Sequence, residues 1–186
     1  MDLTGTNLRT RTGLPDALSV LRDEFPRTGW QEHENFGQMV QFWMNRHVMF
    51  RDLMERLRSD AEKALDGPPD FESYAPQLSR YGGFFLQELH SHHSVEDHHY
   101  FPQLVGLDAR IARGFDILDS DHKELHGLLD GFAESANGVL TRPQDLTSAV
   151  GSLQSTLTEF QRFLDRHLTD EEDLIVPVIL KTGFEG

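Results

Sequence analysis

Cysteine is absent from this chain of 186 residues, and its absence excludes several classes of protein. Without thiols the chain can form no disulfide scaffold, no zinc site with cysteine ligands, no cysteine-ligated iron–sulfur cluster and no cysteine nucleophile. Basic residues are scarce as well, since 17 Lys and Arg stand against 31 Asp and Glu and give a net charge of −14. This surplus of negative charge argues against nucleic acid or an anionic membrane surface as the main partner.

Long apolar runs are also missing from the sequence. No segment approaches the roughly 18 consecutive apolar residues that a membrane span requires, and the opening MDLTGTNLRTRTGLP has no apolar core of a secretory signal. We therefore expect a cytoplasmic protein with no membrane partner. The length is enough for one domain with a proper core, and 13 Phe argue against disorder.

Apolar residues recur every three or four positions, whereas alternating strand patterns are nearly absent. This periodicity predicts an all-α fold with long helices over roughly 33–65, 70–104, 108–138 and from Pro143 to just before Gly183. The tight breaks between them, such as Gly67-Pro68-Pro69, favour an antiparallel up-down-up-down four-helix bundle. A short extra helix is expected at about Pro15–Phe25. The expected organisation is an N-terminal segment over 1–32, the bundle over 33–181 and a tail over 182–186.

A repeat with an offset of 75 residues relates the two halves of the chain. The offset places His92 on His167 and Glu96 on Glu171. It also relates the first long helix to the third and the second to the fourth. This self-similarity predicts two related helical hairpins that pack together.

Four of the ten histidines occur at spacings typical of metal ligands. Residues four apart share one face of a helix, so three such pairs can each point in one direction. Counting residues from the helix ends brings these pairs and one further histidine to a similar level in the bundle. The predicted layer contains His47, His92, Glu96, His122, His126, His167 and Glu171.

Five imidazoles and two carboxylates are poor core material unless their polar atoms find partners. A pair of divalent or trivalent metal ions would satisfy them. Nitrogen and oxygen ligands without thiolates suit iron, and to a lesser degree manganese or zinc. The sequence therefore predicts a metal site inside the bundle.

The ordered motifs resemble those of the hemerythrin-like, or HHE cation-binding, domain family. They are a histidine on the first helix, His-x-x-x-Glu on the second and fourth helices, and His-x-x-x-His on the third. The string HHSVEDHHYFP is similar to the second-helix motif of that family, and the resemblance covers roughly residues 33–181. It implies a four-helix bundle around two non-haem iron ions with a bridging oxo or hydroxo group.

The resemblance also implies an assignment of ligands. His122, His126 and His167 would bind one iron, His47 and His92 the other, and Glu96 and Glu171 would bridge them. Position 51, the repeat partner of His126, is Arg, so the second iron would keep an open coordination position. Dioxygen, nitric oxide or peroxide could bind there.

Two alternatives stay open in this assignment. His93 and Asp97 form a second pair four residues apart, although the repeat partner of His93 is Leu168, which favours His92 with Glu96. In oxygen-carrying hemerythrins the last carboxylate follows its histidine by five residues, and that position here is Glu172.

The expected function is a di-iron protein that binds dioxygen or a related small ligand for sensing, storage or transport. The alternatives are an enzyme that turns over peroxide or nitric oxide, and iron storage or delivery. The chain is too short for a separate signalling domain, so a sensor would need a protein partner.

Overall fold

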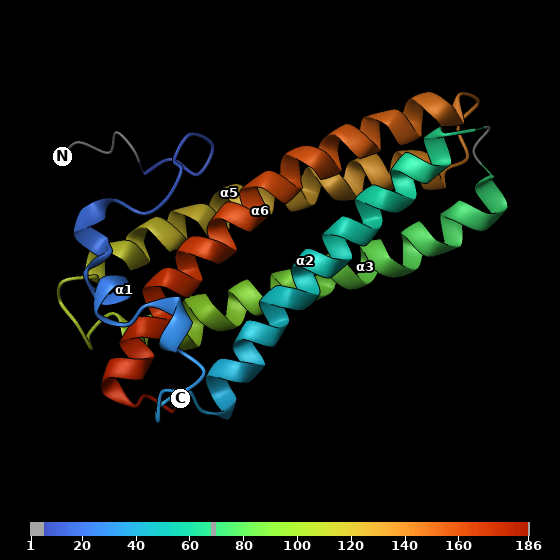
Figure 1. The fold of residues 1–186 in the computed structure, drawn as a ribbon. Coiled ribbons are helices and arrows are strands. Elements are labelled where there is room, and N and C mark those ends of the chain that lie inside the picture. Colours follow the sequence, from blue (N-terminus) through green and yellow to red (C-terminus); the bar gives the residue numbers. More distant parts are fainter. Residues whose placement is uncertain (1–5, 68–69, 186) are drawn as a thin grey trace. The chain divides into compact units, whose positions relative to one another are not determined.

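The computed structural model describes residues 6–67 and 70–185, and within these ranges it contains helices and no strand. The four long helices are α2 (Gln38–Leu65), α3 (Phe71–Val95), α5 (Ala112–Leu140) and α6 (Leu146–Thr182), which can be followed in Figure 1. The predicted all-α bundle is confirmed. Pro68 and Pro69, predicted to end the first helix, and residues 1–5 and 186 of the predicted terminal segments lie outside the described residues.

Short helical elements flank the long ones. The predicted helix near Pro15–Phe25 consists of a 3-10 turn, η1 (Asp16–Leu18), and one short α-helix, α1 (Val20–Glu24), and a further 3-10 turn, η2 (Arg27–Gly29), follows. The predicted helix over 70–104 is α3 continued by a π-helical segment, η3 (Glu96–Tyr100), and by α4 (Phe101–Leu104).

Helices α2, α5 and α6 each begin a few residues later than predicted. Helix α6 starts at Leu146 because the side chain of Asp145 caps it, accepting a 2.9 Å hydrogen bond from the backbone N–H of Ser148. Pro143 therefore precedes the helix instead of opening it. Helix α2 starts at Gln38 because a turn precedes it, in which the backbone N–H of Asn35 donates to Nδ1 of His33.

The chain divides into two compact units, and each of the four long helices contributes a segment to both. The first unit contains residues 1–48, 93–123 and 165–186, and the second contains residues 49–92 and 124–164. The core of the first unit combines apolar residues of α1, α2, α4, α5 and α6 with Trp30. Five of the seven predicted metal ligands belong to this unit: His47, Glu96, His122, His167 and Glu171.

The core of the second unit centres on Phe85, whose ring packs edge-on against Phe50, Phe132 and Phe160. These four rings are fully buried. Phe50 contacts Phe85, whereas Arg56, further along α2, donates to Gln77, which precedes Phe85 in α3. Helices α2 and α3 therefore run antiparallel in this unit. The up-down-up-down order of the complete bundle stays a prediction.

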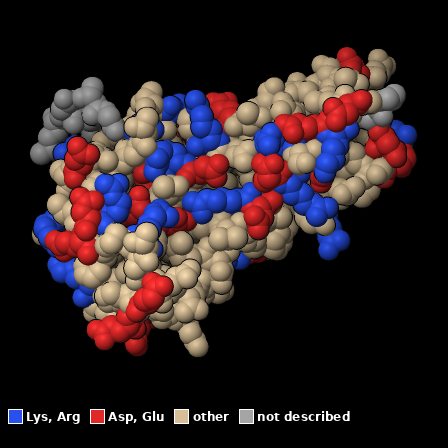
Figure 2. Space-filling model, viewed as in Figure 1, with Lys and Arg blue, Asp and Glu red and all other residues tan. Residues whose placement is uncertain are grey.

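Acidic and basic side chains are interspersed on the face that Figure 2 shows. Several ion pairs of the described residues join side chains of one helix, such as Arg58 with Glu55 and Lys123 with Asp119. Exposed pairs of this kind contribute at most about 1 kcal/mol each. None of the helices in the described ranges combines the length and the apolar character needed to cross a membrane.

Candidate metal centre

Three buried imidazoles meet in the first unit. His93 lies near the end of α3, His122 on α5 and His167 on α6, and each offers a ring nitrogen within 4.8 Å of those of the other two. The rings of His93 and His122 stack with centroids 4.1 Å apart, and the ring of His167 meets that of His122 edge-on at 4.9 Å. We call these three residues the histidine group.

A second buried group contains two imidazoles and two carboxylates: His47, His92, Glu96 and Glu171. Each of these side chains offers one ligand atom within 4.8 Å of the others. Burial, together with the nearby charge of Glu171, raises the pKa of Glu96 well above its usual value, and burial raises the pKa of Glu171 to about 8. Two charged carboxylates in a buried site destabilise the fold unless cations compensate their charge. We call these four residues the mixed group.

The adjacent residues His92 and His93 enter different groups because of helix geometry. Consecutive side chains on an α-helix point about 100° apart, so one histidine pair can supply a ligand to each of two neighbouring sites. Glu96 follows at the first residue of η3, where the π-helical turn begins. Such π-helical turns occur often at functional sites.

The two carboxylates lie close to imidazoles of both groups. Glu171 Oε2 is 3.3 Å from Nε2 of His167 and 3.6 Å from Nε2 of His47. Glu96 Oε2 is 3.7 Å from Nε2 of His122. The other oxygen of Glu96 accepts a 2.6 Å hydrogen bond from the indole N–H of Trp43, which fixes the carboxylate in the core.

Three of the histidines donate a hydrogen bond from Nδ1 to a carboxylate. His47 donates to Glu172 at 3.0 Å, His122 donates to Asp97 at 2.7 Å, and His167 donates to Asp121 at 3.3 Å. A proton on Nδ1 leaves the lone pair of Nε2 free to bind a metal, and this arrangement is the usual one for metal-binding histidines.

The carboxylate of Asp121 is itself held in its charged form. Burial by itself would raise the pKa of Asp121, but hydrogen bonds from Arg11 and His167 outweigh burial and lower it. A charged Asp121 strengthens the hydrogen bond that orients His167.

The residues present fit a metal ion. Nε2 of His122 and of His167 is buried and makes no hydrogen bond within the part of the chain that the structure describes. Buried polar atoms without partners are rare in folded proteins, and a cation would satisfy both. Imidazole nitrogen with carboxylate oxygen, and no thiolate, suits iron, manganese or zinc.

The structure brings six of the seven predicted ligands into the two groups: His47, His92, Glu96, His122, His167 and Glu171. His126 belongs to neither group. It lies one turn beyond His122 on α5, in the second unit, where its ring is 5.5 Å from that of His90. His93 stands in the histidine group instead, although the sequence comparison of the two halves favoured His92 over it.

The residues of the two open alternatives lie in different positions in the structure. His92 and His93 both enter a group, whereas Asp97 and Glu172 hydrogen-bond the Nδ1 atoms of His122 and His47. The signal that could have indicated this is the doubling itself, since His92-His93 and Glu96-Asp97 are adjacent pairs four residues apart.

A family model described as the hemerythrin HHE cation binding domain matches residues 38–179. The search of curated proteins returned no significant match, and the search of solved structures returned none either. The family match and the buried His and Glu groups indicate a metal-binding domain. Because the match extends over most of its 186 residues, the chain belongs to the hemerythrin HHE cation-binding domain family.

Proposed function

We propose that the two groups bind two non-haem iron ions. His93, His122 and His167 would hold one ion, and His47 and His92 the other. Glu96 and Glu171 would bridge the ions, together with an oxo or hydroxo group. The observation that carries this proposal is the position of Glu171 Oε2, within 3.6 Å of an imidazole nitrogen from each group.

We further propose that the iron pair binds dioxygen or a related small ligand, such as nitric oxide or peroxide, for sensing, storage or transport. An iron pair supplies redox-active Lewis-acid positions when it is bound. The mixed group contributes two imidazoles against three in the histidine group, so its ion would keep the open position. Aromatic rings exclude water here, with Phe50 at 5.1 Å from the ring of His92 and Phe101 stacked on His122 at 5.4 Å.

One observation favours the alternative function of a di-iron enzyme. The side chain of Asp97 is 23% exposed and accepts the Nδ1 hydrogen of the buried His122. A carboxylate that contacts both solvent and a buried imidazole can pass protons, which peroxide or nitric oxide turnover requires and a simple carrier does not. Iron storage or delivery has no comparable support from these residues.

The test is metal analysis combined with optical spectra of the reduced protein before and after exposure to air. Two irons per chain and an absorption band that appears with oxygen and disappears on its removal would support reversible binding. Irreversible oxidation with consumption of peroxide or nitric oxide would support the enzyme instead. Zinc alone, or failure to bind iron on anaerobic reconstitution, would overturn the di-iron proposal.

A further inference from the structure

Two arginines near the start of the chain reach the carboxylates that orient candidate metal ligands. They belong to a segment that we call the N-terminal arm, residues 6–29, which precedes the four long helices. The arm lies in the first unit and buries Leu8, Leu18 and Leu21. Its attachment therefore combines apolar packing with charged contacts, among them those of Arg11 and Arg27.

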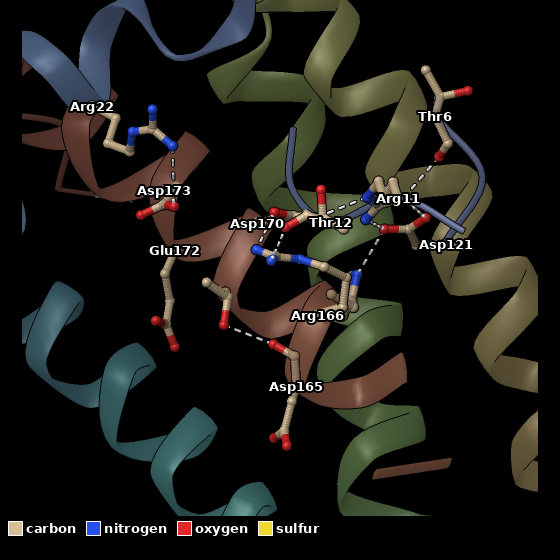
Figure 3. Close-up of polar contacts among 12 residues, drawn as sticks. Thr6, Arg11, Thr12, Arg22, Asp121, Asp165, Arg166, Asp170, Glu172 and Asp173 are labelled. Carbon is tan, nitrogen blue, oxygen red and sulfur yellow. Dashed lines mark hydrogen bonds and ion pairs between the residues drawn. The ribbon is translucent and has the colours of Figure 1, made fainter. Parts of the chain in front are cut away.

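Arg11 is buried between two carboxylates from different helices. Its Nη1 and Nη2 atoms donate to the two oxygens of Asp121, with the Nη1 bond at 2.7 Å, and its Nε donates to Asp170 at 2.8 Å. Figure 3 shows the guanidinium group of Arg11 facing Asp121. The side chains of Arg11, Asp121 and Asp170 are each 1% or 2% exposed, so this cluster is almost completely dry. Asp121 is the carboxylate that accepts the Nδ1 hydrogen of His167.

Arg27 makes the same kind of contact to a carboxylate that orients a histidine of the mixed group. Its Nη1 donates to Glu172 Oε2 at 2.8 Å, and its Nε donates to Asp173 at 2.7 Å. Glu172 uses its other oxygen to accept the Nδ1 hydrogen of His47. The side chain of Arg27 is 41% exposed, whereas that of Glu172 is only 3% exposed.

The same series of hydrogen bonds therefore occurs twice, from an arginine to a carboxylate and from an imidazole to that same carboxylate. In one series the imidazole is His167 of the histidine group, and in the other it is His47 of the mixed group. In both, the arginine uses Nη for the carboxylate that orients the imidazole and Nε for a neighbouring carboxylate. Two independent occurrences of one pattern, each on a different group, are difficult to attribute to general surface charge.

We propose that the N-terminal arm is part of the metal centre, with Arg11 and Arg27 as positioning residues for the histidine group and the mixed group respectively. This inference rests on the proposed function, in which both groups bind metal. Each arginine holds a carboxylate in place, and the carboxylate holds the imidazole with Nε2 directed at its metal. Groups that contact a ligand rather than the metal commonly change metal affinity about 10–100-fold when they are removed.

The planar fork of arginine matters to this arrangement. Arg11 makes two parallel N–H bonds to one carboxylate, a geometry that the ammonium group of lysine cannot reproduce. A lysine at position 11 would keep the charge but lose the fixed orientation. Full rescue of metal affinity by lysine would therefore mean that only charge matters, whereas partial rescue indicates positioning.

The experiment compares metal binding by the full-length chain and by Arg11→Gln, Arg11→Lys, Arg27→Gln and the matched control Arg22→Gln. Arg22 is also in the arm and lies 3.9 Å from Asp173, but none of the histidine-orienting carboxylates is among its described ion pairs. Cobalt(II) titration against a competing chelator would report the affinity of each site, and circular dichroism would report folding. In the metal-free protein, ¹⁵N spectra of the imidazoles would report the Nδ1 hydrogens of His167 and His47.

We expect Arg11→Gln and Arg27→Gln each to weaken one of the two metal sites about 10–100-fold and to leave the other unchanged. The spectra should change for His167 in the first variant and for His47 in the second, with partial recovery in Arg11→Lys. Wild-type affinity at both sites in folded Arg11→Gln and Arg27→Gln overturns the inference, as does an equal effect of Arg22→Gln. If Arg11→Gln does not fold, the metal affinities of Arg27→Gln and Arg11→Lys test the inference. A wild-type chain that binds no metal refutes the proposed function instead.

Discussion

The imidazole rings of His93 and His122 lie nearly parallel, with their centroids 4.1 Å apart and their planes inclined by 17°. Both rings are buried, and Asp97 fixes the second by accepting its Nδ1 hydrogen at 2.7 Å. His93 and Asp97 are four residues apart, so one stretch of chain supplies both the stacked ring and the carboxylate. This relationship makes His93, and not His126, the partner of His122 in the histidine group.

Replacing His93 should therefore remove a metal ligand. We expect His93→Ala to lose one of the two metal ions, because the histidine group would keep only two imidazoles. His126→Ala is the matched control and should keep both ions, since His126 is in neither group. Metal content after gel filtration measures the difference. The opposite pattern, with loss in His126→Ala alone, would restore the ligand set that the resemblance to the hemerythrin-like family implies.

Glu171 and Glu172 are adjacent but should respond differently to substitution. Glu171→Gln is expected to weaken the binding of both metal ions, because the carboxylate lies beside His47 and His167. Glu172→Gln should weaken only the binding of the ion in the mixed group, and by about 10–100-fold, because Glu172 acts through His47. Chelator competition on each purified variant separates the two effects. Equal loss of both ions in the two variants would show that the distinction is wrong.

Helix α5 packs closely against α6 at Gly114. A Cβ atom built on Gly114 would lie 2.5 Å and 2.7 Å from the two methyl carbons of Leu174, which is buried. Gly114→Ala should lower the free energy of unfolding by about 1–3 kcal/mol, as overpacking usually does. Gly131→Ala, also within α5, meets nothing within 4 Å and should raise it by about 0.5–1 kcal/mol. Urea unfolding of the metal-free proteins measures both, and stabilisation by Gly114→Ala would contradict the prediction.

Asp108 should make stability depend on pH below about pH 4. Hydrogen bonds from Arg110 and Lys181 hold the pKa of Asp108 well below its usual value near 3.9. A carboxylate whose pKa is lower in the folded state stabilises the protein above the ordinary pKa, and this stabilisation is lost as the pH falls towards the lowered value. Asp108→Asn should thus be less stable than wild type at pH 6.

The difference between Asp108→Asn and wild type should shrink as the pH is lowered. Denaturant unfolding of the metal-free proteins at pH 6 and at pH 3 gives the comparison. The ion pair with Lys181 links the segment before α5 to the end of α6, so thermal unfolding should respond in the same direction. A difference that stays constant between the two pH values would exclude titration of Asp108 as its cause.

Several features of this protein follow from local sequence alone. The helices follow from the three-and-four spacing of apolar residues, because this spacing produces one apolar face on an α-helix wherever it occurs. The pairing of His167 with Glu171 follows in the same way, since four residues make about one turn. Family membership follows from the order of His and Glu motifs along the chain, which needs no coordinates.

The tertiary structure decided what depends on the rotation of one helix against its neighbours. Whether His93 or His126 joins His122 depends on which faces of α3 and α5 meet, and a hydrophobic pattern defines that face only to within a residue or two. The entry of both His92 and His93 into the groups is decided in the same way.

The role of Arg11 is the clearest case of tertiary placement. Arg11 is one of several polar residues in a segment with no helical pattern, and it meets partners more than 100 residues away, Asp121 and Asp170. The sequence determined which side chains carry metal-binding chemistry, because that depends on residue type and local spacing. Only the folded chain decided which imidazoles share a site and which charges orient them, because contacts between distant segments leave no local periodicity to detect.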